Sequence, residues 1–211
     1  MLTLTVARRN MSHTVVADLV GVSQPTVSRV FRRFLPLIGQ ASCLHVPSFP
    51  GVLTGRVGII DGTLLPTGDR ADHRDDHSGK RRRSGPNVQV MSDLDGQLLA
   101  VSMPTKGSTP DRRACTITGC EDTLAEYDIL GDKAYRGTSV IATIQKPYRG
   151  DFSPGHIDHN HQHSARRAAV ERCIAHLKHR KMTSTRYRGP YKEFPAVIRI
   201  ITTLEFYRLG W

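Results

Sequence analysis

The stretch Val57-Gly58-Ile59-Ile60-Asp61-Gly62 predicts a short buried strand that ends in an acidic turn. An apolar run of this length, closed at once by Asp-Gly, is typical of a central strand in a sheet. The chain repeats the pattern at Ile129-Leu130-Gly131, which leads into Asp132. If the two strands are neighbours, their ends can place both carboxylates at one edge of the sheet, within reach of a ligand.

Other segments complete the sheet and cover it. Val88–Met91 and Leu98–Val101 flank the turn-forming sequence Asp93-Leu94-Asp95-Gly96, which predicts an antiparallel hairpin. Helical patterns cover residues 112–124, 165–181 and 194–209. The order of these elements predicts an α/β fold, with a mixed sheet and helices against its faces.

The first 40 residues predict a small all-α segment with a helix-turn-helix. Gly21 suits the left-handed end of one helix, Ser23 can cap the next, and Pro25 falls in the first turn of that helix. A helix that enters the major groove presents polar side chains to bases and phosphates. The candidates for DNA binding are Gln24, Thr26, Ser28, Arg29, Arg32 and Arg33. An ordinary helical hairpin, in which Gly and Ser serve only as caps, is the alternative.

Residues 41–55 contain Pro47, Pro50, Gly51 and Gly55 without sustained periodicity, so they predict a linker. The predicted organisation has three parts. A helix-turn-helix covers residues 1–40, the linker covers 41–55, and a catalytic domain covers 56–211.

The chain of 211 residues carries a formal net charge of +11. Such an excess favours a polyanionic partner through phosphate contacts, although charge alone also suits acidic membranes. No apolar run approaches the ~20 residues that span a bilayer, and no secretory signal precedes the first helix, so we expect no membrane partner. The four cysteines lack C-x-x-C spacing and are interpreted as reduced thiols of a cytosolic protein.

A dense basic run, Lys80-Arg81-Arg82-Arg83, lies between two predicted strands. We interpret it as a contact with DNA phosphates, with a solvated loop as the alternative. The chain has neither a P-loop nor a Gly-rich dinucleotide motif, which argues against a nucleotide cofactor.

Three acidic residues stand out by position: Asp61, Asp132 and Glu171, the last within the predicted helix 165–181. Carboxylate oxygens are the ligands that Mg²⁺ prefers, and two such ions can promote phosphoryl transfer. Arg167 and Lys178 lie four residues before and seven residues after Glu171, hence on the same helix face. A solvated face with an Arg167–Glu171 pair explains the same spacing, so the residues alone leave the metal site open.

A histidine-rich tract, His156, His159, His161 and His163, lies in a predicted loop. Zinc binding is conceivable there, but no cysteine is spaced to complete the site, and we favour a loop without metal.

The motifs, taken in order, resemble the DDE transposases of bacterial insertion sequences, specifically the insertion sequence five family and its Harbinger-like relatives. The similar segments are Ile60–Thr63, Ser78–Val90, Gly107–Asp111, Gly131–Tyr135 and Arg167–Lys178. The last of these matches the Arg-x3-Glu-x6-Lys part of the family signature.

The resemblance implies an RNase H-like catalytic domain in which Asp61, Asp132 and Glu171 bind two Mg²⁺ ions, with Mn²⁺ as a substitute. It implies cleavage and joining of double-stranded DNA at the ends of a mobile element, by a homo-oligomer in a synaptic complex in the cytoplasm, at the nucleoid. Arg167 and Lys178 are expected to hold the DNA backbone. Two alternatives stay open: a DNA-binding regulator without catalysis, and a nuclease that acts on unrelated DNA.

Overall fold

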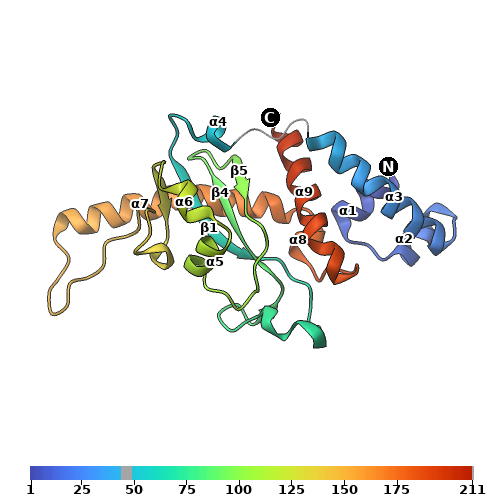
Figure 1. Ribbon diagram of the computed structural model, residues 1–211, viewed down its shortest axis with the longest axis horizontal. Coiled ribbons are helices and arrows are strands. Elements are labelled where there is room, and N and C mark those ends of the chain that lie inside the picture. The colour runs from blue at the N-terminus through green and yellow to red at the C-terminus, as the bar shows by residue number, and fades with distance from the viewer. Residues whose placement is uncertain (44–48, 211) are drawn as a thin grey trace. The chain divides into compact units, whose positions relative to one another are not determined.

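A computed structural model describes residues 1–43 and 49–210 (Figure 1). The chain divides into two compact units. The sheet unit comprises the described residues of Ser48–Thr63 and Asn87–Ile174. The helical unit comprises those of Met1–Pro47, Leu64–Pro86 and Ala175–Trp211.

A mixed four-stranded sheet with the order β5-β4-β1-β6 forms the centre of the sheet unit. Strand β1 (Gly58–Leu64) pairs in parallel with β6 (Ile129–Gly131). Strand β4 (Asn87–Ser92) pairs antiparallel with β5 (Leu98–Val101), as the predicted hairpin requires. The α/β class and the mixed sheet are therefore confirmed, and both agree with an RNase H-like domain.

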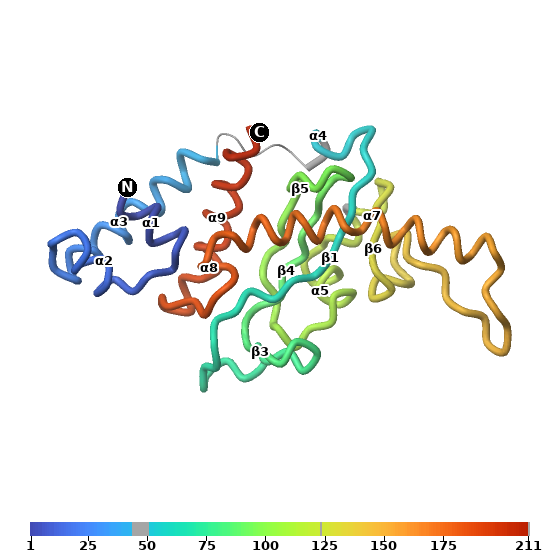
Figure 2. The backbone as a smooth tube through the Cα atoms, turned by 180° about the vertical axis from the view of Figure 1, so that it is seen from behind, coloured from blue at the N-terminus to red at the C-terminus, as the bar shows by residue number. Residues whose placement is uncertain are grey.

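Helices cover both faces of this sheet (Figures 1 and 2). On one face lies α7 (Pro154–Lys178), whose Ala169 and Val170 pack in a core cluster with Ile59 of β1 and Leu130 of β6. On the other lie α5 (Asp111–Ile117) and α6 (Cys120–Leu124). A short 3-10 helix, η2 (Lys133–Tyr135), follows β6. The two layers of helices fix the backbone on either side of the central strands.

Three local predictions were wrong, each for a physical reason. The predicted linker 41–55 contains a helix, α4 (Phe49–Leu53), because Val52 and Leu53 are buried; residues 44–48 of that prediction lie outside the described residues. The single helix predicted over 112–124 is two helices, since Gly119 adopts a φ of 70° between them. The histidine tract belongs to α7, which begins at Pro154, because proline is well tolerated in the first turn.

The helical unit contains the predicted turn between helices. Helices α1 (Leu2–Arg9) and α2 (His13–Val20) precede α3 (Gln24–Cys43). Gly21 ends α2 with a φ of 71°, and the Ser23 hydroxyl accepts a hydrogen bond from the Thr26 amide at 3.4 Å. Both predicted caps are confirmed, whereas α3 extends three residues past the predicted end at residue 40.

Helix α3 packs against α9 (Phe194–Leu209) within this unit, with the side chain of Ile200 directly over Gly39. The smaller elements of the unit are η1 (Ala71–Asp76), β2 (His77–Ser78), β3 (Arg83–Ser84), α8 (Lys181–Ser184) and η3 (Tyr191–Glu193). The residues after the sheet unit thus return to the N-terminal helices and form one core with them.

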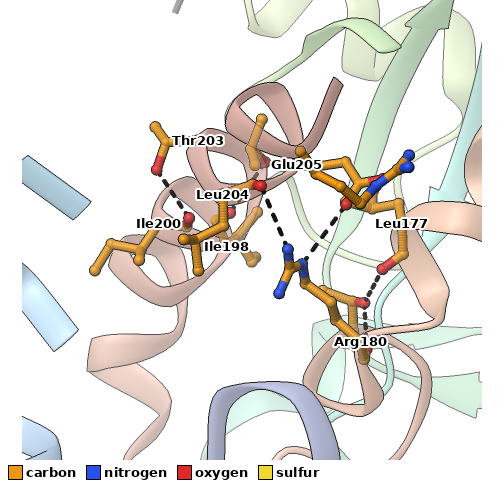
Figure 3. A network of polar contacts seen from close by, with 10 residues as sticks. Leu177, Arg180, Ile198, Ile200, Thr203, Leu204 and Glu205 are labelled. Carbon is orange, nitrogen blue, oxygen red and sulfur yellow. Dashed lines mark hydrogen bonds and ion pairs between the residues drawn. The ribbon is translucent and has the colours of Figure 1, made fainter. Parts of the chain in front are cut away.

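A buried ionic network joins α8 to α9 (Figure 3). The Glu205 side chain is 5% exposed. Its carboxylate forms ion pairs with Arg208 at 2.7 Å and with Arg180 at 3.7 Å. Burial lowers the pKa of Arg180, and the nearby Glu205 carboxylate opposes that shift. The Arg180 guanidinium also donates to the carbonyl of Leu204 at 3.4 Å, so it stays charged and held between both elements.

Within residues 1–43 and 49–210, no helix combines the length and the apolar character that crossing a bilayer would require.

Candidate active site

Asp61 and Asp132 lie on neighbouring strands of the sheet unit. The parallel register pairs Ile60 with Gly131, so Asp61 is the next residue of β1 and Asp132 directly follows the last residue of β6. Strand β6 ends there, and the Asp132 carboxylate accepts a hydrogen bond from the Ala134 amide at 2.7 Å as the cap of η2. Strand β1 was predicted to end at Asp61, which is wrong, because its buried residues continue the strand to Leu64.

Asp61 lies in an environment that disfavours its negative charge. Its side chain is 19% exposed, and burial is the main cause that raises its pKa. The carboxylates of Asp132 and Asp111 raise that pKa further. Two groups oppose them: the Arg167 guanidinium, 3.6 Å from Oδ2, and the Gly62 amide, which donates to Oδ1 at 2.9 Å. A cation is the natural partner for such a site.

Asp111 is a third carboxylate at this site, and because it begins a helix it lacks the strand-end pattern that marks Asp61 and Asp132. It begins α5, and its Oδ1 accepts a hydrogen bond from the Asn87 amide nitrogen at 2.8 Å. The Asp111 carboxylate lies directly over the Cα of Gly62, beside Asp61. The only signal in the sequence was its place in the Gly107–Asp111 segment.

Tyr135 is a fully buried residue close to these three acids. Its ring is fully buried, and its hydroxyl donates a short hydrogen bond to Oε1 of Gln89 on β4. Burial raises the pKa of Tyr135, as do the carboxylates of Asp111, Asp61 and Asp132, in that order. Tyr135 therefore stays neutral and acts as a hydrogen-bond donor.

Glu171 occupies a different position from the two aspartates. It is exposed on α7, directly after Val170 of the core cluster and one turn beyond Arg167. Among residues 1–43 and 49–210, no three Asp, Glu, His or Cys side chains lie close enough together to hold a metal ion. The structure thus brings Asp61 and Asp132 together, with Asp111 nearby, but does not assemble the predicted triad.

These residues fit a divalent metal in part. Two carboxylates on adjacent strands supply hard oxygen ligands, and the crowding of negative charge that raises the pKa of Asp61 is what a bound cation would relieve. The Arg167 guanidinium contacts Asp61 and supplies positive charge at this point. Asp61 and Asp132 are thus the residues that would hold the metal.

The residues predicted to bind DNA divide between the two units. Gln24, Thr26, Ser28, Arg29, Arg32 and Arg33 lie on the first three turns of α3, and Lys80–Arg83 connect β2 to β3, all in the helical unit. Arg167 belongs to the sheet unit, whereas Lys178 ends α7 within the helical unit. Their contacts with DNA stay predictions.

A recess of about 400 Å³ lies beside the predicted recognition helix, within the helical unit. Gln24, Ser28 and Arg32 line one side of it, and Arg188 and Gly189 line another. Thr26 instead bonds to the Ser23 hydroxyl at 2.9 Å. Half of the predicted recognition residues therefore share one side of α3 with the segment after α8, which no sequence motif indicated.

The histidine tract does not gather around one point. His163 is buried, with Nε2 3.0 Å from the carbonyl of Ile141, whereas His161 is exposed.

Among the cysteines, Cys115 and Cys120 interact with each other: the contact lowers the pKa of the Cys120 thiol to about 6 and raises that of Cys115.

The sheet unit is an α/β domain in which Asp61 of β1 and Asp132, directly after β6, lie close together. The family model of the DDE superfamily endonucleases matches residues 60–204, well over half of the chain. The protein therefore belongs to the DDE superfamily endonucleases, whose members generally use divalent metals and act on DNA. A search of curated protein sequences gives no match.

We expect Gly62→Ala to disturb the site and the fold together. A Cβ at this position would overlap the Asp111 carboxylate, so Asp111 or β1 must move. Overpacking of this kind costs about 1–3 kcal/mol in the free energy of unfolding. Urea denaturation of Gly62→Ala and Gly62→Ala/Asp111→Ala measures it. The double variant should recover most of the loss, and an equal loss in both would contradict the overlap.

We expect Asp61→Asn to stabilise the folded protein near neutral pH in the absence of metal. The pKa of Asp61 is raised by folding, so the folded state binds more protons than the unfolded state, and the ionised carboxylate destabilises the fold. That penalty is present above the folded pKa and disappears as the pH falls through it. Melting temperatures of both proteins in chelator should differ at about pH 7 and converge toward about pH 4. A wild-type protein that is the more stable at neutral pH would contradict this.

Proposed function

We propose that the protein is a transposase that cuts and joins DNA at the ends of its own mobile element, as a member of the insertion sequence five and Harbinger-like branch. The observation that carries the proposal is that Asp61 of β1 and Asp132, directly after β6, each follow the last pair in the register of two parallel strands, Ile60 and Gly131. Rigid strands hold both carboxylates without a conformational search, which suits a catalytic site.

Each side chain has a distinct part in this proposal. Asp61 and Asp132 provide oxygen ligands, and Glu171 provides the third after a movement of α7 or of its side chain. A divalent metal at these ligands would supply Lewis acidity to the scissile phosphate and its attacking group. Arg167, which pairs with Asp61 at 3.6 Å, would be available to the phosphate backbone once a cation neutralised that carboxylate.

The reaction would begin with hydrolysis of a phosphodiester bond by water, which leaves a 3′-hydroxyl at the end of the element. That hydroxyl would then attack a phosphodiester bond of target DNA and displace a new 3′-hydroxyl, so each step breaks one P–O bond and forms another. No covalent bond to the protein is required. Joining two ends needs two copies of the site, and we therefore expect a homo-oligomer.

Recognition of the ends is assigned to α3 and to the basic run. Gln24, Ser28 and Arg32 face the recess beside α3, where they can reach base edges or phosphates. Arg29 and Arg33 are exposed on the same helix, and Lys80–Arg83 add positive charge between β2 and β3. These residues and Lys178 would bind the terminal inverted repeats.

A second candidate function is a DNA-binding regulator without catalysis. One observation favours it: the described residues hold no three acidic, histidine or cysteine side chains in metal-binding proximity. The two functions share DNA binding and differ only in strand cleavage.

The test uses a plasmid that carries the repeats flanking the gene, incubated with the purified protein and Mg²⁺ or Mn²⁺. Sequencing of the products maps every new end, and footprinting on the same DNA maps binding. Breaks at the repeat ends that vanish with chelator support the transposase. Protection of the repeats without a break under either metal supports the regulator, and breaks scattered over unrelated DNA support a general nuclease.

A further inference from the structure

Three arginines from two distant parts of the sequence surround one recess within the helical unit. The recess has a volume of about 310 Å³ and is lined by Arg82, Arg83 and Arg186, together with the hydroxyl-bearing residues Ser184 and Thr185. Arg82 directly precedes β3, Arg83 is its first residue, and Arg186 follows α8. No motif in the sequence marks Arg186, which lies between Thr185 and Tyr187.

The charge around this recess is strongly positive. Asp69 is the acidic residue in the lining, and its carboxylate accepts a hydrogen bond from Ser84 at 2.6 Å. All three arginines are exposed, and within residues 1–43 and 49–210 none of the three guanidinium groups forms an ion pair. Guanidinium groups without a protein partner are suited to bidentate contact with phosphate oxygens.

A buried hydroxyl in the lining adds an independent observation. Ser184 Oγ is shielded from solvent and makes no hydrogen bond with any described residue of the chain. A buried polar group is normally paired, because leaving it unpaired costs free energy. A rotation of the Ser184 side chain would bring this hydroxyl to a phosphate oxygen in the recess.

The chain holds Arg186 in place through its neighbours. The side chain of Asn10, at the end of α1, donates to the carbonyl of Arg186 at 2.8 Å and to Thr185 Oγ1 at 2.9 Å. The Tyr187 amide donates to the carbonyl of Pro66 at 3.0 Å, which fixes the segment after α8 to the segment before η1. The aliphatic part of Arg186 lies against Gly68, where a Cβ would come within 2.6 Å of its Cδ. These contacts fix the backbone that carries Arg186 at the recess.

We propose that Arg82, Arg83 and Arg186 form a clamp for the phosphate backbone of duplex DNA, with Arg186 as its centre. The inference rests on the proposed function for its ligand but requires no cleavage. Because the recess is shallow and its arginines are exposed, it fits a phosphate presented on a DNA strand. The clamp would contact phosphates and not bases, so it would position the duplex on the unit that carries α3 without selecting a DNA sequence.

The test is DNA binding by the full chain, measured by fluorescence anisotropy over a series of salt concentrations. Each lost phosphate contact reduces the slope of log K against log salt by about 0.9, which corresponds to about eightfold weaker binding at ~0.1 M salt. Arg186→Gln should show this loss, whereas Arg186→Lys should keep most of the slope. Arg199→Gln is the matched control, since Arg199 is an exposed arginine of α9 outside the recess.

The outcomes separate this inference from the proposed function. A slope for Arg186→Gln equal to that of Arg199→Gln overturns the clamp, whether or not the protein cuts DNA. A reduced slope in a protein that cuts nothing supports the clamp and contradicts the transposase. A Tm equal to wild type shows that Arg186→Gln remains folded; if it is lower, Arg82→Gln replaces it with the same expected slope.

Discussion

Asp61→Asn and Asp132→Asn are each expected to reduce DNA cleavage by about 10³-fold or more, while DNA binding persists. Each substitution keeps the shape of the side chain and removes one charged ligand oxygen. Metal ions contribute several kcal/mol to the stabilisation of a phosphoryl-transfer transition state, and about 4 kcal/mol corresponds to 10³ in rate. Single-turnover cleavage of a duplex that carries the element end, at saturating protein and fixed Mg²⁺, measures the effect.

Two further variants identify the third ligand. Glu171→Gln removes the acid that the family resemblance assigns to the metal, and Asp111→Asn removes the one that lies nearer to Asp61. If Glu171 is the ligand, its variant should lose as much activity as Asp61→Asn, and Asp111→Asn should lose less. The matched control is Glu126→Gln, at an exposed position of the same unit, which should cleave like wild type. Cleavage by Asp61→Asn at the control rate would contradict the catalytic role of the pair.

Glu205→Gln is expected to lower the free energy of unfolding by about 3–5 kcal/mol, the cost of removing one partner from a buried ion pair. The substitution preserves the volume of the side chain but leaves Arg180, with a side chain 17% exposed, without its counter-charge. Arg208, which pairs with the same carboxylate at 2.7 Å, loses this ion pair as well. Figure 3 shows the contacts of Arg180 with Glu205 and with the carbonyl of Leu204.

Urea denaturation of the full chain measures this loss. Asp18→Asn is the control, because Asp18 is exposed on α2 of the same unit, and a surface change of this kind stays within about 0.5 kcal/mol. A loss for Glu205→Gln no larger than for the control would show that the buried network contributes little to the fold.

The strands that carry the site could be predicted because their signal is local. Short apolar runs ending in Asp61 and Asp132 identify strands without knowledge of the rest of the chain. The parallel pairing of β1 with β6 confirms the prediction that the two strands are neighbours. The true end of β1 at Leu64 was missed, because the Asp-Gly pair has the composition of a turn but is enclosed by buried residues on both sides.

Contacts between distant residues could not be predicted in the same way. Asp111 lies near Asp61 because α5 begins next to Gly62 of β1. The hydrophobic periodicity of the sequence does not predict this contact. Arg186 and the basic run meet for a similar reason, through hydrogen bonds made by Asn10 and the Tyr187 amide. The sequence located the acidic strands, whereas the packing of the chain decided which charges surround them.

Calorimetric titration of the protein with Mn²⁺ tests the central claim, that Asp61 and Asp132 together hold a catalytic divalent metal. Mn²⁺ is suitable because carboxylate oxygens are among its preferred ligands. The account predicts that the wild type and Glu126→Gln bind Mn²⁺ alike, and that Asp61→Asn and Asp132→Asn each lose this binding while remaining folded. Binding of Mn²⁺ by both aspartate variants with wild-type affinity would contradict the claim and place the metal elsewhere.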